Sequence, residues 1–343
     1  MKYSQLGKSG LVVSKLSIGC MLFGGEGEYF GLKYSLGFKE AEQLVSHSID
    51  SGINLFDTAN MYNSGKSEEM LGKILGNKRK SVLISSKIGF RVGNEIFNSG
   101  ISYKHIIEQC EDSLKRLKTD YIDLFSLHID DPITSIEEIA RALENLQSSG
   151  KIRYSGISNW QAWRTTSLAQ WQKNRGYSPV ISAQMHYSLL NRGIEDEFLP
   201  MAENYGIGIM AWSPLSGGFL TGKYSRANPK PEDGRLNTFD LHLFDREKGY
   251  TIIEKVLEIA KKHNTSATAV SIAWLLSKKY CSSILLGVSK LSQFKDNLDS
   301  LEVILSKEEV QLLDDISKEP LKYPGVFVNF QDSQLKEAKV VIQ

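Results

Sequence analysis

Three stretches of the chain decide its fold, and each ends on a side chain that can carry chemistry: INLFDTANMY at residues 53–62, VLISSK at 82–87 and YIDLFSLH at 121–128. Each contains an apolar run of strand length. The polar residues at or just past the ends of these runs are Asp57, Tyr62, Lys87 and His128. The carboxyl ends of consecutive parallel strands meet at one rim of a barrel, so these four side chains are expected to lie together.

The same alternation continues through most of the chain. Apolar runs of strand length are each followed by a segment with helical period, which is typical of βαβ units and a parallel sheet. Eight such units predict an α/β fold, the (β/α)₈ TIM barrel. The expected strands are residues 16–19, 53–57, 82–87, 122–128, 152–158, 180–185, 207–212 and 283–287. An N-terminal β-hairpin is expected over residues 3–13, where it could close the barrel floor.

Two segments interrupt this rhythm within what we expect to be one domain, residues 1–343. Residues 215–247 are too long for an ordinary connection, and loops of that length are usually functional lids or disordered. Residues 319–343 form a tail. We expect both segments to close a substrate pocket together with residues 22–37, which are rich in glycine and contain Tyr29, Phe30 and Tyr34. The aromatic residues of the tail could cover substrate, or pack against the barrel or a neighbouring subunit; they are Tyr323, Phe327 and Phe330.

The composition excludes several function classes. The net charge is +1 with the charged residues interspersed, so no basic stripe predicts nucleic-acid binding. No apolar run reaches the roughly 18–20 residues that span a bilayer, and the first residues do not resemble a signal peptide. The three cysteines are far apart and predict neither a disulfide framework nor a metal site. We therefore expect a cytoplasmic protein with reduced thiols and no metal, either a monomer or a homo-oligomer.

Strand alternation supports the rim site. Side chains two apart on a strand share a face, so the residues preceding Asp57, Lys87 and His128 at this spacing should point into the barrel. They are small or apolar, as a filled barrel interior requires. These residues are Ile53, Leu55, Leu83, Ser85, Leu124 and Ser126.

The four rim residues suit one reaction. A free tyrosine has a pKa of about 10, and a nearby ammonium such as Lys87 favours the phenolate and lowers the pKa of Tyr62. Asp57 would keep Lys87 charged, and His128 could orient a substrate oxygen. The set suits protonation of an oxygen that becomes an alkoxide, as in carbonyl reduction by hydride transfer.

Simpler interpretations exist for each residue taken alone. A strand-end Asp–Lys pair is often only a structural ion pair. Tyr62 alone could be a rim aromatic, and His128 alone a hydrogen-bonded core histidine. Their joint position on consecutive strands favours the catalytic interpretation.

The sequence strongly resembles the aldo-keto reductase superfamily over nearly its whole length. The motifs that carry the resemblance are FDTANMY-x-x-G-x-SEEMLGKIL, SSK, DLFSLH, GISNW, AQMHYSLLNR, MAWSPLSGG and GVS-x-x-x-Q-x-x-DN, in this order. The branch it resembles contains bacterial aldo-keto reductases and potassium-channel β subunits. The resemblance implies a catalytic tetrad of Tyr62 as general acid with Lys87, Asp57 and His128.

The resemblance also implies a nicotinamide nucleotide, usually NADPH, bound without a Rossmann domain. Ser158, Asn159 and Gln184 would bind the carboxamide, with Trp212 stacked on the ring. The implied pyrophosphate contacts are Ser213, Pro214, Leu215, Ser216, Gly217, Lys223 and Arg235. The adenosine end would lie against Gly287, Ser289, Gln293, Asp296 and Asn297. Gly19, Cys20 and Met21 would line the first-strand edge, with Met61 and Trp160 as substrate-pocket walls.

Some of these residues have structural alternatives. Trp212 could simply pack in the barrel, and Ser158 or Asn159 could cap a helix that starts near Gln161. Gln293 and Asn297 lie four apart, as on a solvated helix face. Glycines 217 and 218 do allow the backbone to approach a phosphate closely.

The chain departs from the family pattern at two places. Many relatives carry an arginine pair after the last strand, where this chain has Ser289-Lys290. Lys290 could approach a 2′-phosphate, so NADPH is expected rather than NADH, although serine and lysine are a weaker signal than paired arginines. Cys20-Met21 replaces the aromatic residue common after the first strand.

We therefore expect an NADPH-dependent aldehyde or ketone reductase, with sugars and keto-sugars among its candidate substrates. One alternative is a redox-sensing NADP(H)-binding regulatory module with slow turnover. Another is a sugar-phosphate isomerase or lyase with a Schiff base on Lys87, which would need an uncharged lysine.

Overall fold

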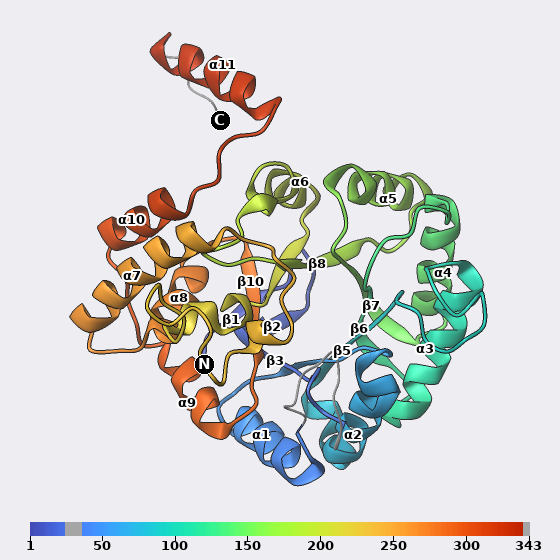
Figure 1. Ribbon diagram of the computed structural model, residues 1–343. Helices are drawn as coiled ribbons and strands as arrows, with labels where there is room; N and C mark the ends of the chain where they lie inside the picture. Colours follow the sequence, from blue (N-terminus) through green and yellow to red (C-terminus); the bar gives the residue numbers. More distant parts are fainter. Residues whose placement is uncertain (25–35, 339–343) are drawn as a thin grey trace.

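Eight parallel strands close into a barrel surrounded by helices in the computed structural model, which describes residues 1–24 and 36–338 (Figure 1). Around the barrel the strands follow chain order, from β3 to β10 and back to β3. This confirms the (β/α)₈ prediction. The strands are β3 (Leu16–Gly19), β4 (Leu55–Asp57), β5 (Leu83–Ile88), β6 (Ile122–Leu127), β7 (Ile152–Ser158), β8 (Val180–His186), β9 (Gly208–Trp212) and β10 (Cys281–Gly287).

The helices cover the outside of the barrel and begin where the sequence carries capping residues. Several start at a Ser or Asp whose side chain accepts a hydrogen bond from the first-turn backbone, which satisfies one otherwise unpaired N–H group; these are Ser102, Ser135, Asp245, Ser266 and Ser306. The helices are α1 (Phe38–Asp50), α2 (Lys66–Leu75), α3 (Tyr103–Leu117), α4 (Ile136–Ser148), α5 (Ala162–Arg175), α6 (Phe198–Tyr205), α7 (Arg246–Lys262), α8 (Ala267–Leu276), α9 (Leu291–Asp299), α10 (Lys307–Ser317) and α11 (Gly325–Glu337). None of these helices is long and apolar enough to cross a bilayer.

The barrel interior is filled by its own apolar cluster, separate from the larger core between strands and helices. Leu55, Leu83 and Leu124 belong to or pack against this inner cluster, as the strand alternation predicts. Ile53 does not: it lies in the outer core, because β4 begins only at Leu55 and the alternation cannot be extended back to it. A filled interior leaves only the rim for chemistry.

The N-terminal hairpin closes the barrel floor, as expected. Its strands are β1 (Tyr3–Gln5) and β2 (Val12–Ser14), and Leu6 between them is fully buried in the inner cluster. Gly7 at the turn has φ +61°, and a Cβ there would lie 2.3 Å from the carbonyl oxygen of Gly206. The chain therefore needs a glycine for the hairpin to seat this closely.

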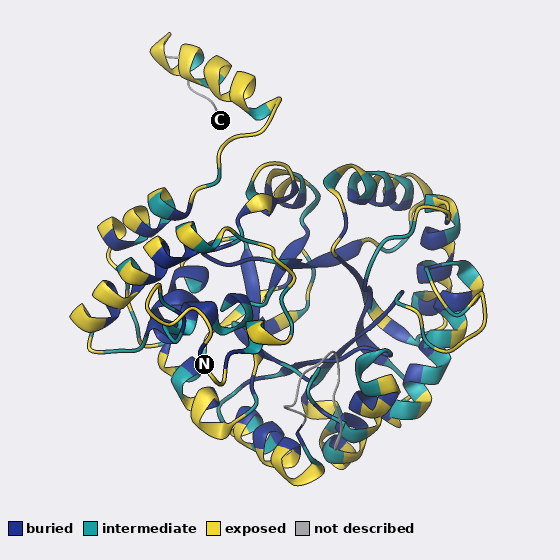
Figure 2. Ribbon diagram, viewed as in Figure 1, coloured by how far each residue is buried: buried dark blue, intermediate teal, exposed yellow. Residues whose placement is uncertain are grey.

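The two interrupting segments behave differently from each other. Within residues 215–247, Phe219 and Tyr224 are buried and stack with ring centroids 5.4 Å apart, so this segment is packed on the barrel. The tail instead forms α11, which the sequence did not predict, and which projects away from the barrel (Figures 1 and 2). Its aromatic residues Tyr323, Phe327 and Phe330 are 84%, 67% and 63% exposed. They neither cover the barrel mouth nor pack on the barrel, so those two expectations are wrong. The expected lid aromatics Tyr29, Phe30 and Tyr34 lie outside the described residues.

Candidate active site

A buried ion pair lies at the centre of the rim. Asp57 ends β4 and Lys87 lies near the end of β5, the neighbouring strand. Lys87 Nζ lies 2.7 Å from Asp57 Oδ2 and donates to the carbonyl oxygen of Thr58 at 2.6 Å. Asp57 Oδ1 accepts hydrogen bonds from Ser85 Oγ at 2.8 Å and Gln184 Nε2 at 2.9 Å. Both charges are therefore fully hydrogen-bonded, which a buried pair requires.

Tyr62 reaches this pair from a short 3₁₀ turn, Tyr62–Gly65. Lys87 Nζ donates to Tyr62 Oη at 3.3 Å and lies 4.8 Å from the centre of the phenol ring. The residues after Tyr62 have left-handed backbone, including Asn63 at φ 48°. Asn63 Nδ2 donates to the carbonyl oxygens of Met21 and Phe23, which holds the turn and hence the phenol in place.

His128 follows β6 directly and completes the group. Its backbone N–H donates to the carbonyl oxygen of Ile88 at 2.7 Å. Its ring meets the Tyr62 ring edge-on, with centroids 5.7 Å apart, and the Phe90 ring at 4.8 Å. Nδ1 of His128 is buried and has no hydrogen-bond partner among the described residues. The four predicted rim residues thus do converge, and Phe90, which the sequence analysis did not single out, lies beside them.

Burial determines the protonation states of the group. It raises the pKa of Tyr62 above the ordinary value, because the loss of solvent outweighs the opposing effect of the Lys87 charge. The expectation that Lys87 lowers the pKa of Tyr62 on balance is therefore wrong. Burial, reinforced by the Lys87 charge, holds the pKa of His128 well below its usual range. Burial opposes the charge on Lys87, but Asp57 and Tyr62 together raise the pKa of that ammonium. At neutral pH the site holds a phenol, a neutral imidazole and a charged lysine.

Three further strand ends carry polar side chains that bond to one another. Ser158 Oγ donates to the carbonyl oxygen of Gln184 at 2.8 Å. Asn159 Nδ2 donates to the carbonyl oxygen of His128 at 3.1 Å, and Asn159 Oδ1 accepts from Trp212 Nε1 at 3.1 Å. The helix-capping alternative is wrong, because Gln161 is the cap residue of α5 and no side chain caps that helix. Trp212 is partly exposed while packing against the inner cluster.

The first-strand edge joins this group. Gly19 pairs with Asp57 on one side and with Gly287 on the other. Cys20 is fully buried, and its backbone N–H donates to the carbonyl oxygen of Asp57 at 2.7 Å. Burial, with a contribution from the Asp57 charge, raises the pKa of the Cys20 thiol well above its usual range. Met21 is held by Asn63 as described above.

A cleft of about 410 Å³ runs along the barrel top beside β10. It is lined by Leu22, Ser213, Pro214, Leu215, Gly217, Gly218, Thr221, Lys223, Asp233, Arg235, Ser266, Thr268, Leu286, Gly287, Ser289, Lys290, Gln293, Asp296 and Asn297. These include every residue predicted for the pyrophosphate and adenosine ends except Ser216, whose side chain is buried against Ser188. The sequence analysis missed Thr221, Asp233, Ser266 and Thr268. Ser266 could have been recognised as a helix cap, but its place on the cleft depends on the fold.

The cleft offers positive charge. Lys223 is paired with Asp233 at 3.1 Å, whereas no ion pair of Arg235 or Lys290 is found within residues 1–24 and 36–338. Burial lowers the pKa of Arg235, but a guanidinium retains its charge at neutral pH. The N-terminus of α8, capped by Ser266, also faces the cleft and favours an anion. These features fit a ligand with phosphate groups.

The remaining predicted residues lie elsewhere or have other partners. Gln293 Oε1 accepts from Ser289 N and Oγ, both at 3.0 Å, and Asn297 is buried, so this helix face is not simply solvated. Met61 lines a second, polar cleft of about 1000 Å³ beside α3. Trp160 is 2% exposed and belongs to the outer core. Their contact with a substrate stays a prediction. Across the described ranges, no cluster of three or more His, Cys, Asp or Glu side chains could hold a metal ion.

Comparison with known proteins agrees with this geometry. The model of the aldo/keto reductase family matches residues 15–318. A protein of Oryza sativa subsp. japonica named "Probable voltage-gated potassium channel subunit beta" is 35% identical, with 89% of this chain and 92% of the relative covered. "Uncharacterized oxidoreductase YrpG" of Bacillus subtilis is 32% identical over 93% of this chain and 97% of its own length. "Versiconal hemiacetal acetate reductase" of Aspergillus parasiticus is 33% identical over 95% and 99%.

The match covers the whole barrel, and the strand ends that the family model spans are those that bring Asp57, Tyr62, Lys87 and His128 together. The chain belongs to the aldo/keto reductase family.

Proposed function

We propose that this protein is an NADPH-dependent reductase that converts an aldehyde or ketone to an alcohol, with sugars and keto-sugars among the candidate substrates. The observation that carries the proposal is the chain of contacts from Asp57 through Lys87 to Tyr62, at 2.7 Å and 3.3 Å. An oxidoreductase function agrees with the family and with the names of the YrpG and hemiacetal acetate reductase relatives.

Tyr62 is the proposed general acid. Its raised pKa keeps the phenol protonated at neutral pH. As a hydride adds to the carbonyl carbon, the C=O double bond becomes a single bond and the oxygen takes the proton from Tyr62 Oη. The tyrosinate left behind lies beside the Lys87 ammonium, which stabilises that developing charge. Asp57 holds the ammonium in place and keeps it charged.

His128 is the proposed orienting residue. The imidazole is neutral at pH 7 because its pKa is lowered, so it can donate one hydrogen bond to the carbonyl oxygen without adding a charge. Its ring contacts with Tyr62 and Phe90 restrict where that oxygen can lie.

The cleft supports NADPH as the cofactor, which when bound would supply the hydride. Ser158, Asn159, Gln184 and Trp212 would hold the nicotinamide end, beside Gly19, Cys20 and Met21. The loop from Ser213 to Gly217, with Lys223 and Arg235, would hold the pyrophosphate. Gly287, Ser289, Gln293, Asp296 and Asn297 would hold the adenosine end, with Lys290 near a 2′-phosphate. The unpaired charges of Arg235 and Lys290 in the described part of the cleft favour NADPH over NADH.

The proposal is tested by NADPH oxidation at 340 nm against a panel of aldehydes and ketones, with Tyr62→Phe alongside. The wild type should turn over, and Tyr62→Phe should lower kcat by about 10²-fold or more, as the loss of a general acid does. Equal rates in both proteins would contradict the role of Tyr62.

A second candidate is a redox-sensing NADP(H)-binding regulatory module with slow turnover. It is favoured by the similarity to a protein named as a potassium channel β subunit. Tight NADPH binding with no turnover across the panel would support it. The raised pKa of Lys87 argues against a Schiff-base function, because that chemistry needs an uncharged lysine.

A further inference from the structure

The loop Ser213–Gly218 has an unusual backbone. Ser213, Ser216, Gly217 and Gly218 all have positive φ values, of 53°, 47°, 66° and 89°. Two of these residues are serines, for which the left-handed region is unfavourable. A serine stays in this region only where its surroundings hold it there.

Within the loop, hydrogen bonds account for part of this shape. Ser216 N donates to the Ser213 carbonyl oxygen at 2.9 Å, and Gly218 N to the Leu215 carbonyl oxygen at 2.9 Å. Gly217 N donates to Ser213 Oγ at 3.3 Å. These bonds join residues inside the loop and do not fix the loop to the barrel.

Ser216 supplies the attachment to the barrel. Unlike its neighbours, it does not line the cleft, and only 3% of its surface is exposed. Its hydroxyl lies 2.8 Å from the hydroxyl of Ser188, which is fully buried. Ser188 Oγ also accepts from Leu190 N at 3.1 Å, which leaves its proton free for Ser216. This serine pair thus holds the loop from behind, in addition to the apolar packing of Leu215 and Phe219 on the core.

Ser188 itself lies in a firmly held turn. Ser188 and Asn191 exchange backbone hydrogen bonds of 3.2 Å, and Arg192 follows. The Arg192 guanidinium makes two 2.7 Å bonds to Glu195 and donates to Ser317 Oγ at 2.6 Å.

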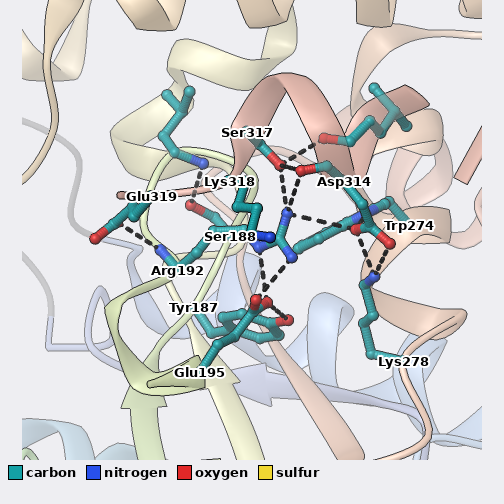
Figure 3. A network of polar contacts seen from close by, with 12 residues as sticks. Tyr187, Ser188, Arg192, Glu195, Trp274, Lys278, Asp314, Ser317, Lys318 and Glu319 are labelled. Carbon is teal, nitrogen blue, oxygen red and sulfur yellow. Dashed lines mark hydrogen bonds and ion pairs between the residues drawn. The ribbon is translucent and has the colours of Figure 1, made fainter. Parts of the chain in front are cut away.

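Figure 3 shows how this guanidinium lies between Tyr187, Trp274 and α10, with Ser188 close by. It lies 5.1 Å from the Trp274 ring and donates to the Asp314 carbonyl oxygen at 3.0 Å. Arg192 is 7% exposed. The network therefore ties the Ser188 turn to α8 and α10.

We propose that Ser188 is a positioning residue for cofactor binding: through Ser216 it holds the Ser213–Gly218 loop in its left-handed shape before NADPH arrives. Ser188 is fully buried and does not line the cleft. Without the Ser188 hydroxyl, the loop would populate other shapes. The affinity for NADPH would then fall by the same factor as the fraction of molecules whose loop has the binding-competent shape. This inference rests on the proposed function.

The test is Ser188→Ala, with the NADPH dissociation constant measured by quenching of tryptophan fluorescence. The dissociation constant should rise about tenfold, the size expected for one buried hydrogen bond. At saturating NADPH, kcat and the KM for the carbonyl substrate should stay within about twofold, because the reacting groups are untouched. If Ser188 only stabilised the fold, Ser188→Ala would lower the melting temperature but would not raise the NADPH dissociation constant while leaving kcat and KM unchanged.

The matched control is Ser17→Ala. Ser17 belongs to another fully buried serine pair, with Ser283 Oγ 3.0 Å from Ser17 Oγ, and neither of these two serines lines the cleft. It should lose stability without a change in NADPH affinity. Ser216→Ala removes the same hydrogen bond from the other side. Because both substitutions remove one shared bond, the double variant should bind NADPH no less tightly than the single variant with the lower affinity.

Unchanged NADPH affinity in Ser188→Ala and Ser216→Ala would overturn the inference while leaving the proposed function intact. An equal rise in Ser17→Ala would also overturn it. An unaltered protein that does not bind NADPH would overturn both.

Discussion

The side-chain amide of Gln184 donates a hydrogen bond of 2.9 Å to the carboxylate of Asp57, although 127 residues separate them in sequence. The bond crosses the barrel mouth, from β8 to β4. It joins a residue proposed to hold the nicotinamide end to the ion pair that supports the proposed acid. In the proposed mechanism, one hydrogen bond therefore links the position of the cofactor to the delivery of the proton.

Gln184→Leu should lower kcat by about tenfold or more. The buried Asp57 carboxylate would lose one of its two donors at Oδ1, and a hydrogen bond to a charged group contributes about 1.5–3 kcal/mol. Steady-state reduction at saturating NADPH measures the effect. Gln172→Leu is the control, since Gln172 is also buried and its amide oxygen accepts from Val180 N at 3.1 Å, away from the site. A similar loss of kcat in both variants would argue against a specific role for Gln184.

Stability should fall as the pH is lowered through the range just below about 6.5. Burial lowers the pKa of His186 to about 4 and that of His128 well below its usual range. The unfolded chain takes up protons on these imidazoles below about 6.5 whereas the folded protein does not, so the free energy of unfolding decreases from there toward pH 4. Urea unfolding at pH 7.5 and pH 5 measures the difference.

The variant that isolates one of these imidazoles is His186→Phe. It keeps an aromatic ring beside Trp212, whose ring centroid is 4.5 Å from that of His186, and it removes the titration. Its loss of stability between the two pH values should be smaller than that of the wild type. The exposed His47 provides the control variant His47→Gln, and a pH dependence identical in wild type and His186→Phe would refute the prediction.

Lys290→Ala should weaken the binding of NADPH far more than the binding of NADH. Lys290 lines the cleft beside Ser289 and has no ion pair across the described ranges, so its charge is available to a 2′-phosphate. The KM for NADPH should rise about tenfold with little change for NADH, consistent with one charge-assisted contact. Lys295→Ala, within α9, which Lys290 directly precedes, and away from the cleft lining, should change neither. If Lys290→Ala changed the KM for NADPH and for NADH equally, Lys290 would not be the residue that binds the 2′-phosphate.

Gly7→Ala should lower the free energy of unfolding by about 3 kcal/mol. The left-handed backbone alone costs about 1–2 kcal/mol for a residue with a Cβ, and the contact with Gly206 at 2.3 Å adds an overpacking cost of about 1–3 kcal/mol. Gly176→Ala separates the two terms, because Gly176 has φ +68° with nothing within 4 Å of an added Cβ. Urea unfolding should show the smaller loss for Gly176→Ala; equal losses would mean that the floor hairpin adjusts to the new methyl group.

The rim positions of Asp57, Lys87 and His128 could be predicted from the sequence because they depend on local strand patterns and on one topological rule. Each strand ends where its apolar run ends, and neighbouring strand ends meet. The closed floor was predictable for the same reason, since the hairpin glycines are local signals.

Other features depend on packing that no local pattern contains. The direction in which the pKa of Tyr62 shifts depends on how much solvent the assembled rim excludes. The sequence shows only the neighbouring charge of Lys87. Ser216 sits in a motif associated with phosphate binding, but its side chain faces Ser188 because the loop turns through left-handed residues. Helix α11 has apolar residues on several sides, including Val326, Phe327 and Val328, so no single face predicted it.

The burial of the cysteines has a consequence for the proposed reduction of aldehydes. Aldehydes are electrophiles that add to thiolates, so a reactive thiol near the reaction centre would be consumed by the substrate itself. Cys20, Cys110 and Cys281 are all buried, and burial raises the pKa of Cys110 and of Cys281 to about 12. A thiol with so high a pKa carries almost no thiolate at neutral pH. If aldehydes are the substrates, these thiols should not be consumed by them, and the protein should keep its activity in the presence of alkylating reagents that inactivate enzymes with accessible thiols.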